Sequence, residues 1–443
     1  MGAKPPVRKR AESKRGPSTL VFKTLMLTGS IAVGFAAVAT TPVYLATGVS
    51  YALIVPIVIA GLSLLAMWSR SRATISRCLR RLWPLGAFAL ITLGVAAIAS
   101  FRMGAGVAGV VRYSLGPASW FSAAVIGYIS GRSNRVPLVV AVGSATAAAL
   151  LGLVALTEAF GASSPIGRFY IAWLTATGAW SPSSGEYFRA VGLDLDPNAF
   201  GLIGAVAVVA ALCIRGPVWT RVLGGAACGS VLALSGSRTA LAASMAGLVV
   251  AALVQWADRR ASGGHRAFSV VPALSGLLVA IVVLGFAVTA QAGPDSALRR
   301  LGISGSTAAA SDVTGQSAVD IASSGRTEIW AEALRWYRRY PFGAFLQPES
   351  LVGRSIHNEY LERLLFGGPV LLAAFVGLLV WLAARIRPSS APALGPTLCA
   401  VYAVSALTLG PSLQPAFLTL AFYLVGWGRA QPEDAISLAA RHN

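Results

Sequence analysis

The feature that most constrains this chain is a series of apolar stretches, separated by short segments that carry arginine. A helix needs about 20 mainly apolar residues to cross the hydrocarbon core of a bilayer, and the stretches have about this length. Only 12% of the 443 residues are charged, whereas a water-soluble domain has about 25%. The sequence therefore predicts an all-α polytopic membrane protein. It excludes a soluble enzyme, a collagenous fibre, a disordered tail and a disulfide-stapled secreted domain.

We predict about 12 transmembrane helices, within a range of about 10 to 12. The predicted spans are residues 24–40, 49–68, 82–100, 113–129, 137–159, 199–214, 218–234, 239–256, 268–290, 369–384, 393–409 and 413–427. The seventh and twelfth spans are short enough to be re-entrant segments. The predicted organisation is a basic tail (1–23), nine spans (24–290), a large extracytoplasmic loop (291–368), three spans (369–427) and a second tail (428–443).

The net charge of +20 lies almost entirely in the tails and in alternate loops. Cytoplasmic loops of membrane proteins carry an excess of lysine and arginine, so this distribution predicts that both termini are cytoplasmic. Topology and attraction to anionic lipid headgroups explain the charge without nucleic acid. The basic N-terminus has no cleavable apolar core after it and is interpreted as a tail, not a signal peptide. The four cysteines fall in spans or on the inner side, where packing is the expected role.

Two predicted outer segments, 160–198 and 291–368, are long enough to hold a site. In the second, residues 302–322 are rich in Ser, Ala and Thr, and from Ser324 the pattern becomes helical until Pro341. One apolar stripe is expected from Ile329, Trp330, Ala333, Leu334, Trp336, Tyr337 and Tyr340, with Glu328, Glu332, Arg335 and Arg339 on the other face. This amphipathic helix is predicted to lie on the membrane surface or over the mouth of the bundle. Simple anchoring is the alternative to a functional role.

Two arginines in the outer segments are candidates for binding phosphate. Ser324-Gly325-Arg326 places a guanidinium beside the free N–H groups of a helix start, an arrangement that suits an anion. Arg238 lies in the tight turn Ser235-Gly236-Ser237-Arg238, close to hydrocarbon. Such an arginine is costly without an anionic partner, although it could instead anchor its span at the interface.

His357 is the single histidine predicted on the outer side. Histidine titrates near working pH and can act as a general base. The segment Ser355-Ile356-His357-Asn358-Glu359-Tyr360 precedes a predicted short helix with a Glu359 to Arg363 pair, stopped by Gly367-Gly368. A purely structural histidine is the alternative.

Asp194 and Asp196 form an Asp-x-Asp pair before the sixth predicted span. Such a pair could bind a divalent ion on a diphosphate. We favour the other interpretation, in which Asp196 or Asn198, with Pro197 between them, caps the helix start.

These motifs occur in the order seen in the O-antigen ligase and polymerase superfamily, which the chain resembles over about residues 190 to 370. The motifs are Asp196-Pro197-Asn198, Ser235-Gly236-Ser237-Arg238, Gly325-Arg326-Thr327-Glu328-Ile329-Trp330, Tyr340-Pro341-Phe342-Gly343 and His357-Asn358-Glu359-Tyr360. One departure is that Gly343 is followed by Ala344-Phe345, where many relatives keep a second glycine.

The resemblance implies a glycosyltransferase of the bacterial cytoplasmic membrane that works at its outer face. It would transfer a glycan from a polyprenyl (undecaprenyl-type) diphosphate to the hydroxyl of a glycan or lipid-anchored acceptor, with inversion and without a metal or other cofactor. Arg238 and Arg326 would bind the diphosphate and His357 would act on the acceptor hydroxyl. Supporting residues would be Ser237, Arg354, Asn358, Glu359, Asp196 and Asn198. Ligase and polymerase differ in the acceptor, and both remain open.

Two other readings compete. A transporter or exporter of an envelope sugar-lipid would bury ionisable residues within its spans, and few are present. A peptidoglycan-polymerase-like glycosyltransferase would use an acid of the large outer loop, for which Asp295, Asp312 and Asp320 are the candidates.

Overall fold

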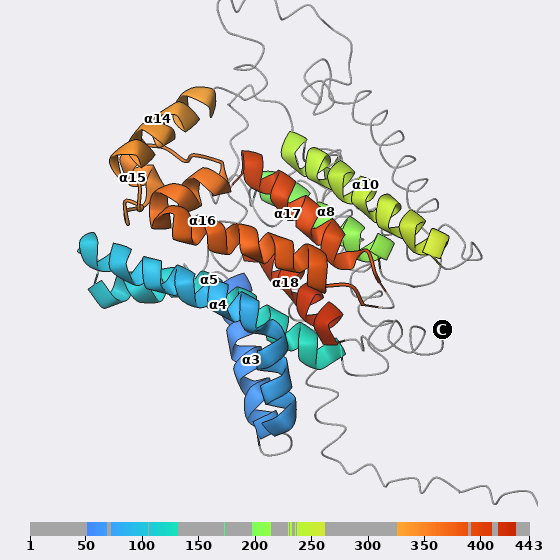
Figure 1. The fold of residues 1–443 in the computed structure, drawn as a ribbon. Coiled ribbons are helices and arrows are strands. Elements are labelled where there is room, and N and C mark those ends of the chain that lie inside the picture. The colour runs from blue at the N-terminus through green and yellow to red at the C-terminus, as the bar shows by residue number, and fades with distance from the viewer. Residues whose placement is uncertain are drawn as a thin grey trace, which may run out of the picture.

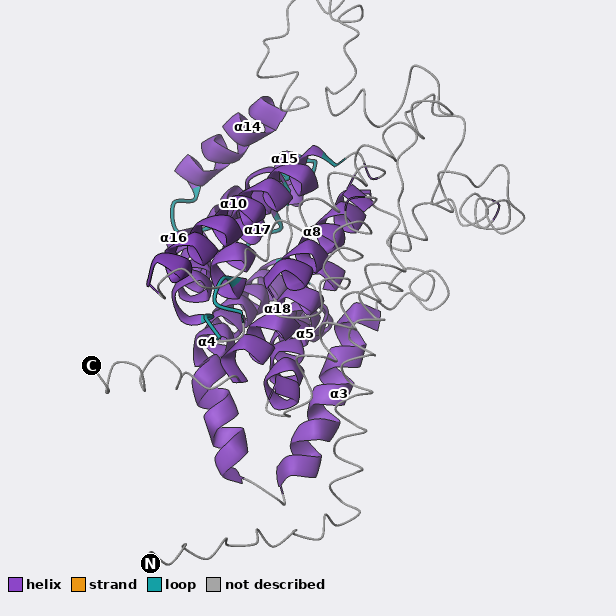
Figure 2. Cartoon of the chain, turned by 90° about the vertical axis from the view of Figure 1, so that its right-hand side faces the viewer, coloured by secondary structure: helices purple, strands orange, loops and turns teal. Residues whose placement is uncertain are grey.

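The computed structural model describes residues 51–68, 72–104, 106–131, 197–213, 237–261, 326–388, 391–409 and 415–430, together with a few single residues. Every regular element in these ranges is a helix (Figures 1 and 2). The helices are α3 (Tyr51–Trp68), α4 (Arg72–Arg102), α5 (Gly106–Gly131), α8 (Pro197–Cys213), α10 (Arg238–Ala261), α14 (Arg326–Arg339), α15 (Pro348–Val352), α16 (Glu359–Arg385), α17 (Leu394–Thr408) and α18 (Pro415–Ala430).

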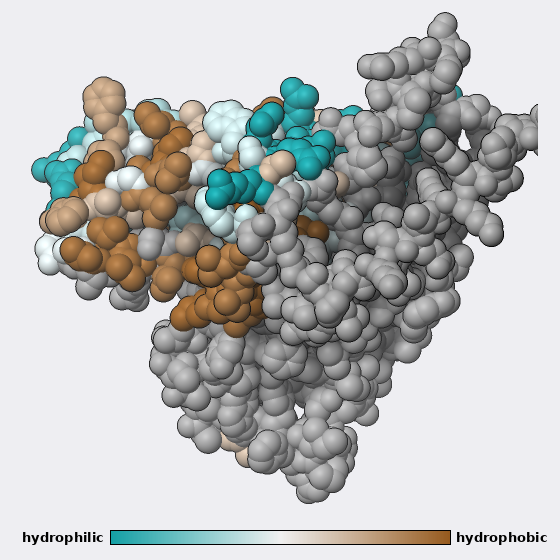
Figure 3. Space-filling model, turned by 90° about the horizontal axis from the view of Figure 1, so that it is seen from below, coloured by the Kyte–Doolittle hydropathy of each residue, from teal (hydrophilic) through white to brown (hydrophobic). Residues whose placement is uncertain are grey.

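Within the described residues, three stretches of helix are long and apolar enough to cross a membrane: Arg72–Arg102, Thr239–Asp258 and Glu359–Arg385. Large apolar side chains are exposed on all three. Figure 3 shows a broad apolar patch on one face of the described part of the molecule. Leu90 of α4 is 69% exposed and Val370 of α16 is 68% exposed. Lipid, unlike water, is a favourable environment for such a surface, which agrees with the predicted membrane location.

Eight of the predicted spans fall on described helices, and the helices are generally longer than the apolar runs. The helix predicted at 82–100 begins at Arg72, because a helix continues into polar sequence where nothing stops it. The spans predicted at 24–40, 137–159, 218–234 and 268–290 lie wholly or mostly outside the described residues. Among the described cysteines, Cys78, Cys213 and Cys399 form no disulfide bond, and Cys228 lies outside the described residues.

The predicted stop at Gly367-Gly368 is confirmed. Gly368 has non-helical backbone angles (φ 68°, ψ −164°), so the first helix ends at this kink and a second helix continues to Arg385, the two together being α16. Pro369, which follows, occupies the first position after the bend, where a missing N–H costs least. The predicted short helix and the tenth predicted span are therefore two arms of one kinked helix.

The closest packing in the described bundle joins α5 to α18. A Cβ atom at Gly127 would overlap the backbone of Tyr423, and one at Gly426 would overlap the backbone of Ala124. Small residues at a helix interface let two backbones approach, as is common between membrane helices. Since Gly127 lies at Tyr423 and Gly131 at Trp427, the two helices run in the same direction.

Hydrogen bonds between different segments of the chain show which helix ends lie together at each end of the bundle. Arg81 donates to the Arg429 carbonyl, and Arg429 donates to the Arg385 carbonyl. At the other end, Arg102 donates to the Ala344 carbonyl and Asn358 to the Leu407 carbonyl. The first group coincides with the ends that the charge pattern predicts to be inside, and the second with those predicted to be outside. We call the second group the outer end of the bundle.

Candidate functional site

His357 lies in a short loop at the outer end, immediately before α16. Its backbone has a φ of 52°, the left-handed region that few side chains other than Gly, Asn, Asp and His adopt readily. The two neighbouring residues, Ile356 and Asn358, are buried, whereas His357 itself is half-buried. The turn thus presents the imidazole while its neighbours hold the loop in place.

The helix α14 holds this loop from one side. Its Trp330 Nε1 donates a 3.0 Å hydrogen bond to the carbonyl oxygen of Ile356. Ile329 and Ala333, one helical turn apart, form a small core with Ile356. The predicted apolar stripe is confirmed for most of its members, but Leu334 is 43% exposed and lies with the charged face.

Arg326 is the first residue of α14 and is half-buried. Residues four apart lie on one side of a helix, so Arg326 shares its side with Trp330, which bonds to the His357 loop. The predicted phosphate-binding start at Arg326 therefore lies on the helix that supports His357. Ser324 and Gly325 lie outside the described residues.

The helix α17 holds the His357 loop from the other side, through three consecutive residues. Asn358 Nδ2 donates to the Leu407 carbonyl (3.1 Å), and Tyr360 Oη donates to the Ala403 carbonyl (3.2 Å). Between them, Glu359 Oε1 accepts a 3.2 Å hydrogen bond from Tyr402 Oη. Asn358 also caps α16, because its Oδ1 accepts from the Leu361 N–H.

The Glu359 to Arg363 pair is confirmed at 2.8 Å, and it is buried rather than at the surface. Both Nη2 and Nε of Arg363 donate to Glu359 Oε1. The guanidinium also lies over the rings of Phe88 and Phe375, at 5.7 and 5.9 Å from their centroids. The sequence revealed the i,i+4 spacing, but Tyr402 and Phe88 come from distant helices and left no local signal.

The Tyr340-Pro341-Phe342-Gly343 motif forms a turn that packs on the bend of α16. Gly343 has a φ of 98°, and a Cβ there would overlap Gly367 and Gly368. The Ala344 N–H donates to the Leu365 carbonyl (2.7 Å), and the Phe345 N–H to the Phe366 carbonyl (3.1 Å). Phe345, in the segment where the family resemblance leads us to expect a second glycine, has a φ of 52°, a backbone that glycine favours.

The serine turn before α10 brings two predicted supporting residues together. Ser237 Oγ donates a 3.1 Å hydrogen bond to Asn198 Oδ1 and accepts one from the Ala240 N–H. Ser237 is thus the N-cap of α10, whose first residue is Arg238. The backbone at Arg238 is held at the outer end by this link to α8.

α8 begins at Pro197, which places Asn198 in the first turn, where its Oδ1 accepts from Ser237 of the neighbouring turn. Of the two predicted caps, Asp196 therefore remains the candidate, and it stays a prediction. Asp194 and Asp196 lie outside the described residues. Across the described part of the chain, no three His, Cys, Asp or Glu side chains are grouped to hold a metal ion.

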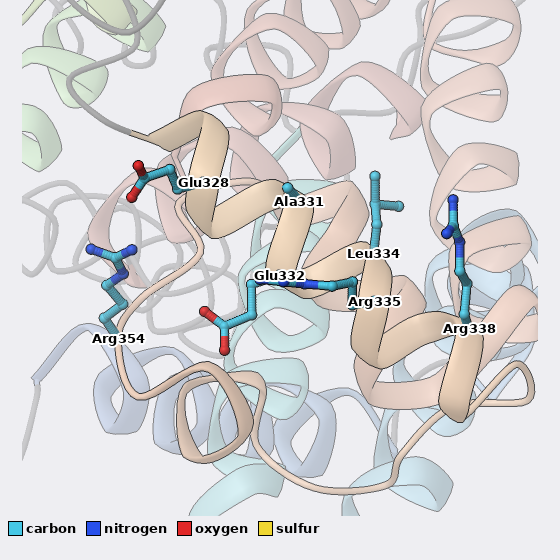
Figure 4. A pocket seen from close by; sticks show the side chains of 7 residues that line it. All are labelled: Glu328, Ala331, Glu332, Leu334, Arg335, Arg338 and Arg354. Atoms are coloured by element: carbon cyan, nitrogen blue, oxygen red, sulfur yellow. The ribbon is translucent and has the colours of Figure 1, made fainter. Parts of the chain in front are cut away.

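The helix α17 links the elements that carry His357 and Arg238, because it contacts both α16 and α10 (Figure 1). It accepts a hydrogen bond from Asn358, the residue after His357, and it packs along α10, the helix that begins at Arg238. Arg354, the remaining predicted residue, is exposed and lies across from the charged face of α14 (Figure 4).

The family model described as O-antigen ligase matches residues 223–376. This range includes Arg238, Arg326 and His357 but not Asn198. No curated protein gives a match to the chain. The match at residues 223–376 thus supports the resemblance of the chain to the O-antigen ligase/polymerase superfamily, and the described apolar helices indicate an integral membrane protein.

Proposed function

We propose that the protein transfers a glycan from a polyprenyl diphosphate carrier to an acceptor hydroxyl at the outer face of a bacterial cytoplasmic membrane. The family match supports glycan transfer in the cell envelope. The observation that carries the assignment is that two helices, α14 and α17, both hydrogen-bond to the loop that contains His357. α14, which begins at Arg326, holds it through Trp330, and α17, which runs along α10, holds it through Asn358.

In this reaction His357 takes the proton of the acceptor hydroxyl while the hydroxyl oxygen attacks the anomeric carbon of the donor sugar. The bond between that carbon and the diphosphate oxygen breaks, and its electron pair leaves with the polyprenyl diphosphate. Arg238 and Arg326 neutralise the charge that develops on the leaving group. A single displacement from the opposite side inverts the anomeric configuration, and no metal is needed for this role.

The other predicted residues would position these three. Ser237 and Asn198 fix the start of α10 through their mutual hydrogen bond. Asn358 and Glu359 fix the residues after His357 against α17. Arg354 is exposed near α14, where it is available to the glycan. Asp196 would act at the start of α8.

The proposed orientation places both termini in the cytoplasm and residues 291–368 outside. The clustering of basic residues in the tails and alternate loops supports it. In this orientation, the large loop and the starts of α8, α10, α14 and α16 all face the side on which envelope glycans are assembled.

The test replaces His357, Arg238 and Arg326 singly with Ala and measures transfer together with the pool of lipid-linked glycan. Loss of the base should lower transfer about 10²- to 10⁴-fold. Loss of either arginine should lower it about 10²- to 10³-fold. The untransferred carrier-linked glycan should accumulate, and its chain length separates a ligase from a polymerase.

The matched control is Arg387→Ala, which removes an exposed arginine at the other end of the bundle. It should leave transfer unchanged. Normal transfer in all three site variants, with normal amounts of protein in the membrane, would refute the proposal.

A further inference from the structure

A groove runs along the exposed side of α14, with a volume of about 530 Å³ (Figure 4). This is within the range of small-molecule sites, which is about 300 to 1,000 Å³. Its lining comes from α14 and from the loop after α15, and consists of Glu328, Ala331, Glu332, Leu334, Arg335, Arg338 and Arg354.

The groove is separate from the candidate catalytic loop. Its residues recur at the spacing of one helix face, as Glu328, Glu332 and Arg335 illustrate. Ile329 and Ala333, which are buried against the His357 loop, lie on the opposite face. A ligand in the groove would therefore contact α14 from the side away from His357.

The lining is rich in hydrogen-bonding groups that are not committed to one another. It contains two carboxylates and three guanidinium groups. No ion pair joins these groups in the described part of the chain; the buried pair nearby, Glu359 with Arg363, lies outside the groove. The carboxylates are on neighbouring turns at an i,i+4 spacing, an arrangement that destabilises a helix slightly. The helix dipole offers another explanation of this charge pattern, because it favours acidic residues near the start of α14 and basic residues near its end. The dipole does not, however, account for the concave shape of this surface.

These groups match a chain of sugars better than an ion. A hydroxyl both donates and accepts hydrogen bonds, so it can bond to a guanidinium and to a carboxylate together. The two carboxylates repel a phosphate, and the three guanidinium groups repel a cation. Ala331 and the 43% exposed Leu334 add an apolar strip that fits the C–H face of a sugar ring.

We propose that this groove, the α14 groove, binds the hydroxyl-rich part of a glycan substrate, several sugars away from the reacting bond. The inference rests on the proposed function, because it names a subsite of the same reaction. A helix rises about 1.5 Å per residue, so the twelve steps from Arg326 to Arg338 extend about 18 Å along α14. The groove thus lies along a helix whose start carries a candidate diphosphate ligand.

The experiment compares the double variant Glu332→Ala/Arg335→Ala with Arg339→Ala. Arg339 is one turn from Arg335, is exposed and has the same charge, but does not line the groove. The double variant should raise the KM for one glycan substrate by about tenfold or more and leave kcat unchanged. This is the effect expected from the loss of one or two hydrogen bonds to charged groups. Arg339→Ala should match the wild type.

Varying the carrier-linked donor and the acceptor in separate series identifies the occupant. A higher KM for the donor alone assigns the groove to the donor chain, and a higher KM for the acceptor alone assigns it to the acceptor. Unchanged KM values in both series, or a kcat that falls with no change in KM, would overturn the inference.

A binding measurement separates this inference from the proposed function. The probe is the free oligosaccharide released by mild acid from the lipid-linked glycans of the same cells. Saturation-transfer NMR with the full-length protein in nanodiscs should detect binding that the double variant weakens and His357→Ala does not. Equal binding to wild type and double variant overturns the groove assignment even if transfer depends on His357. Groove-dependent binding with normal transfer in His357→Ala supports the groove and refutes the catalytic role.

Discussion

At the scale of single residues, the left-handed backbone of His357 is the feature most closely related to the proposed function. A left-handed conformation costs an ordinary residue about 1 to 2 kcal/mol, and here it is held by a hydrogen bond to Ile356 on one side and by Asn358 on the other. Strain that surrounding contacts maintain is common where a side chain must be presented in one direction. The geometry thus agrees with a working imidazole.

Substitutions at His357 should separate the loss of the imidazole from the loss of the turn. Asparagine tolerates the left-handed region, so His357→Asn should fold normally and lose transfer about 10²- to 10⁴-fold. Valine does not tolerate it, so His357→Val should also lower the free energy of unfolding by about 1 to 2 kcal/mol. Thermal unfolding in detergent and a transfer assay measure the two effects. Wild-type transfer by His357→Asn would contradict the role of the imidazole.

The buried pair Glu359 and Arg363 should be sensitive to the loss of one partner. Arg363→Ala leaves the fully buried Glu359 carboxylate without its cation, and we expect a loss of about 3 to 5 kcal/mol in the free energy of unfolding. The double variant Glu359→Gln/Arg363→Met keeps an acceptor for Tyr402 and removes both charges. It should recover most of the loss in thermal unfolding. A double variant less stable than Arg363→Ala would show that the ion pair itself is strongly stabilising.

At the scale of elements, the bend of α16 and the turn at Gly343 form one structural unit. Gly368 and Gly343 both have positive φ values and lie in backbone contact, and backbone hydrogen bonds continue the contact to Phe345. The first arm of α16 carries Glu359 and Arg363, while the second arm reaches the inner end. The bend therefore sets how the residues after His357 meet α17.

Replacing the glycine of the bend should be much more harmful than replacing another glycine of the same helix. Gly368→Ala adds a Cβ that overlaps the Phe342 carbonyl at a backbone with a φ of 68°. We expect it to lower the free energy of unfolding by about 2 to 4 kcal/mol. Gly377→Ala is the matched control, because no atom lies within 4 Å of its Cβ position. Equal melting temperatures for the two variants would argue against a tight bend.

At the scale of the whole molecule, the described helices have two chemically different ends. Arginines bond to helix carbonyls at one end, as Arg81 and Arg429 do. At the other end lie the capped starts of α10 and α16 and the start of α14. The dipoles of such starts favour an anionic ligand, which agrees with the diphosphate chemistry that we propose for the outer end.

Single-cysteine reporters should place the two ends on opposite sides of the membrane. In a background without the four native cysteines, Arg354→Cys and Arg387→Cys put a thiol at an exposed position of each end. An impermeant maleimide should modify Cys at 354 in right-side-out vesicles and Cys at 387 in inside-out vesicles. Modification of both positions from one side would contradict the arrangement of the bundle.

The sequence by itself determined the class of the protein, the approximate position of its helices and the identity of its candidate residues. Apolar length decides what can cross a bilayer, and capping and turn residues are local signals. Only the tertiary structure decided that the turn at Gly343 packs on the kink at Gly368, that Asn198 bonds Ser237, and that Tyr402 and Trp330 hold the residues around His357. These contacts join helices far apart in the chain, and their partners are chosen by packing, which no local pattern of residues encodes.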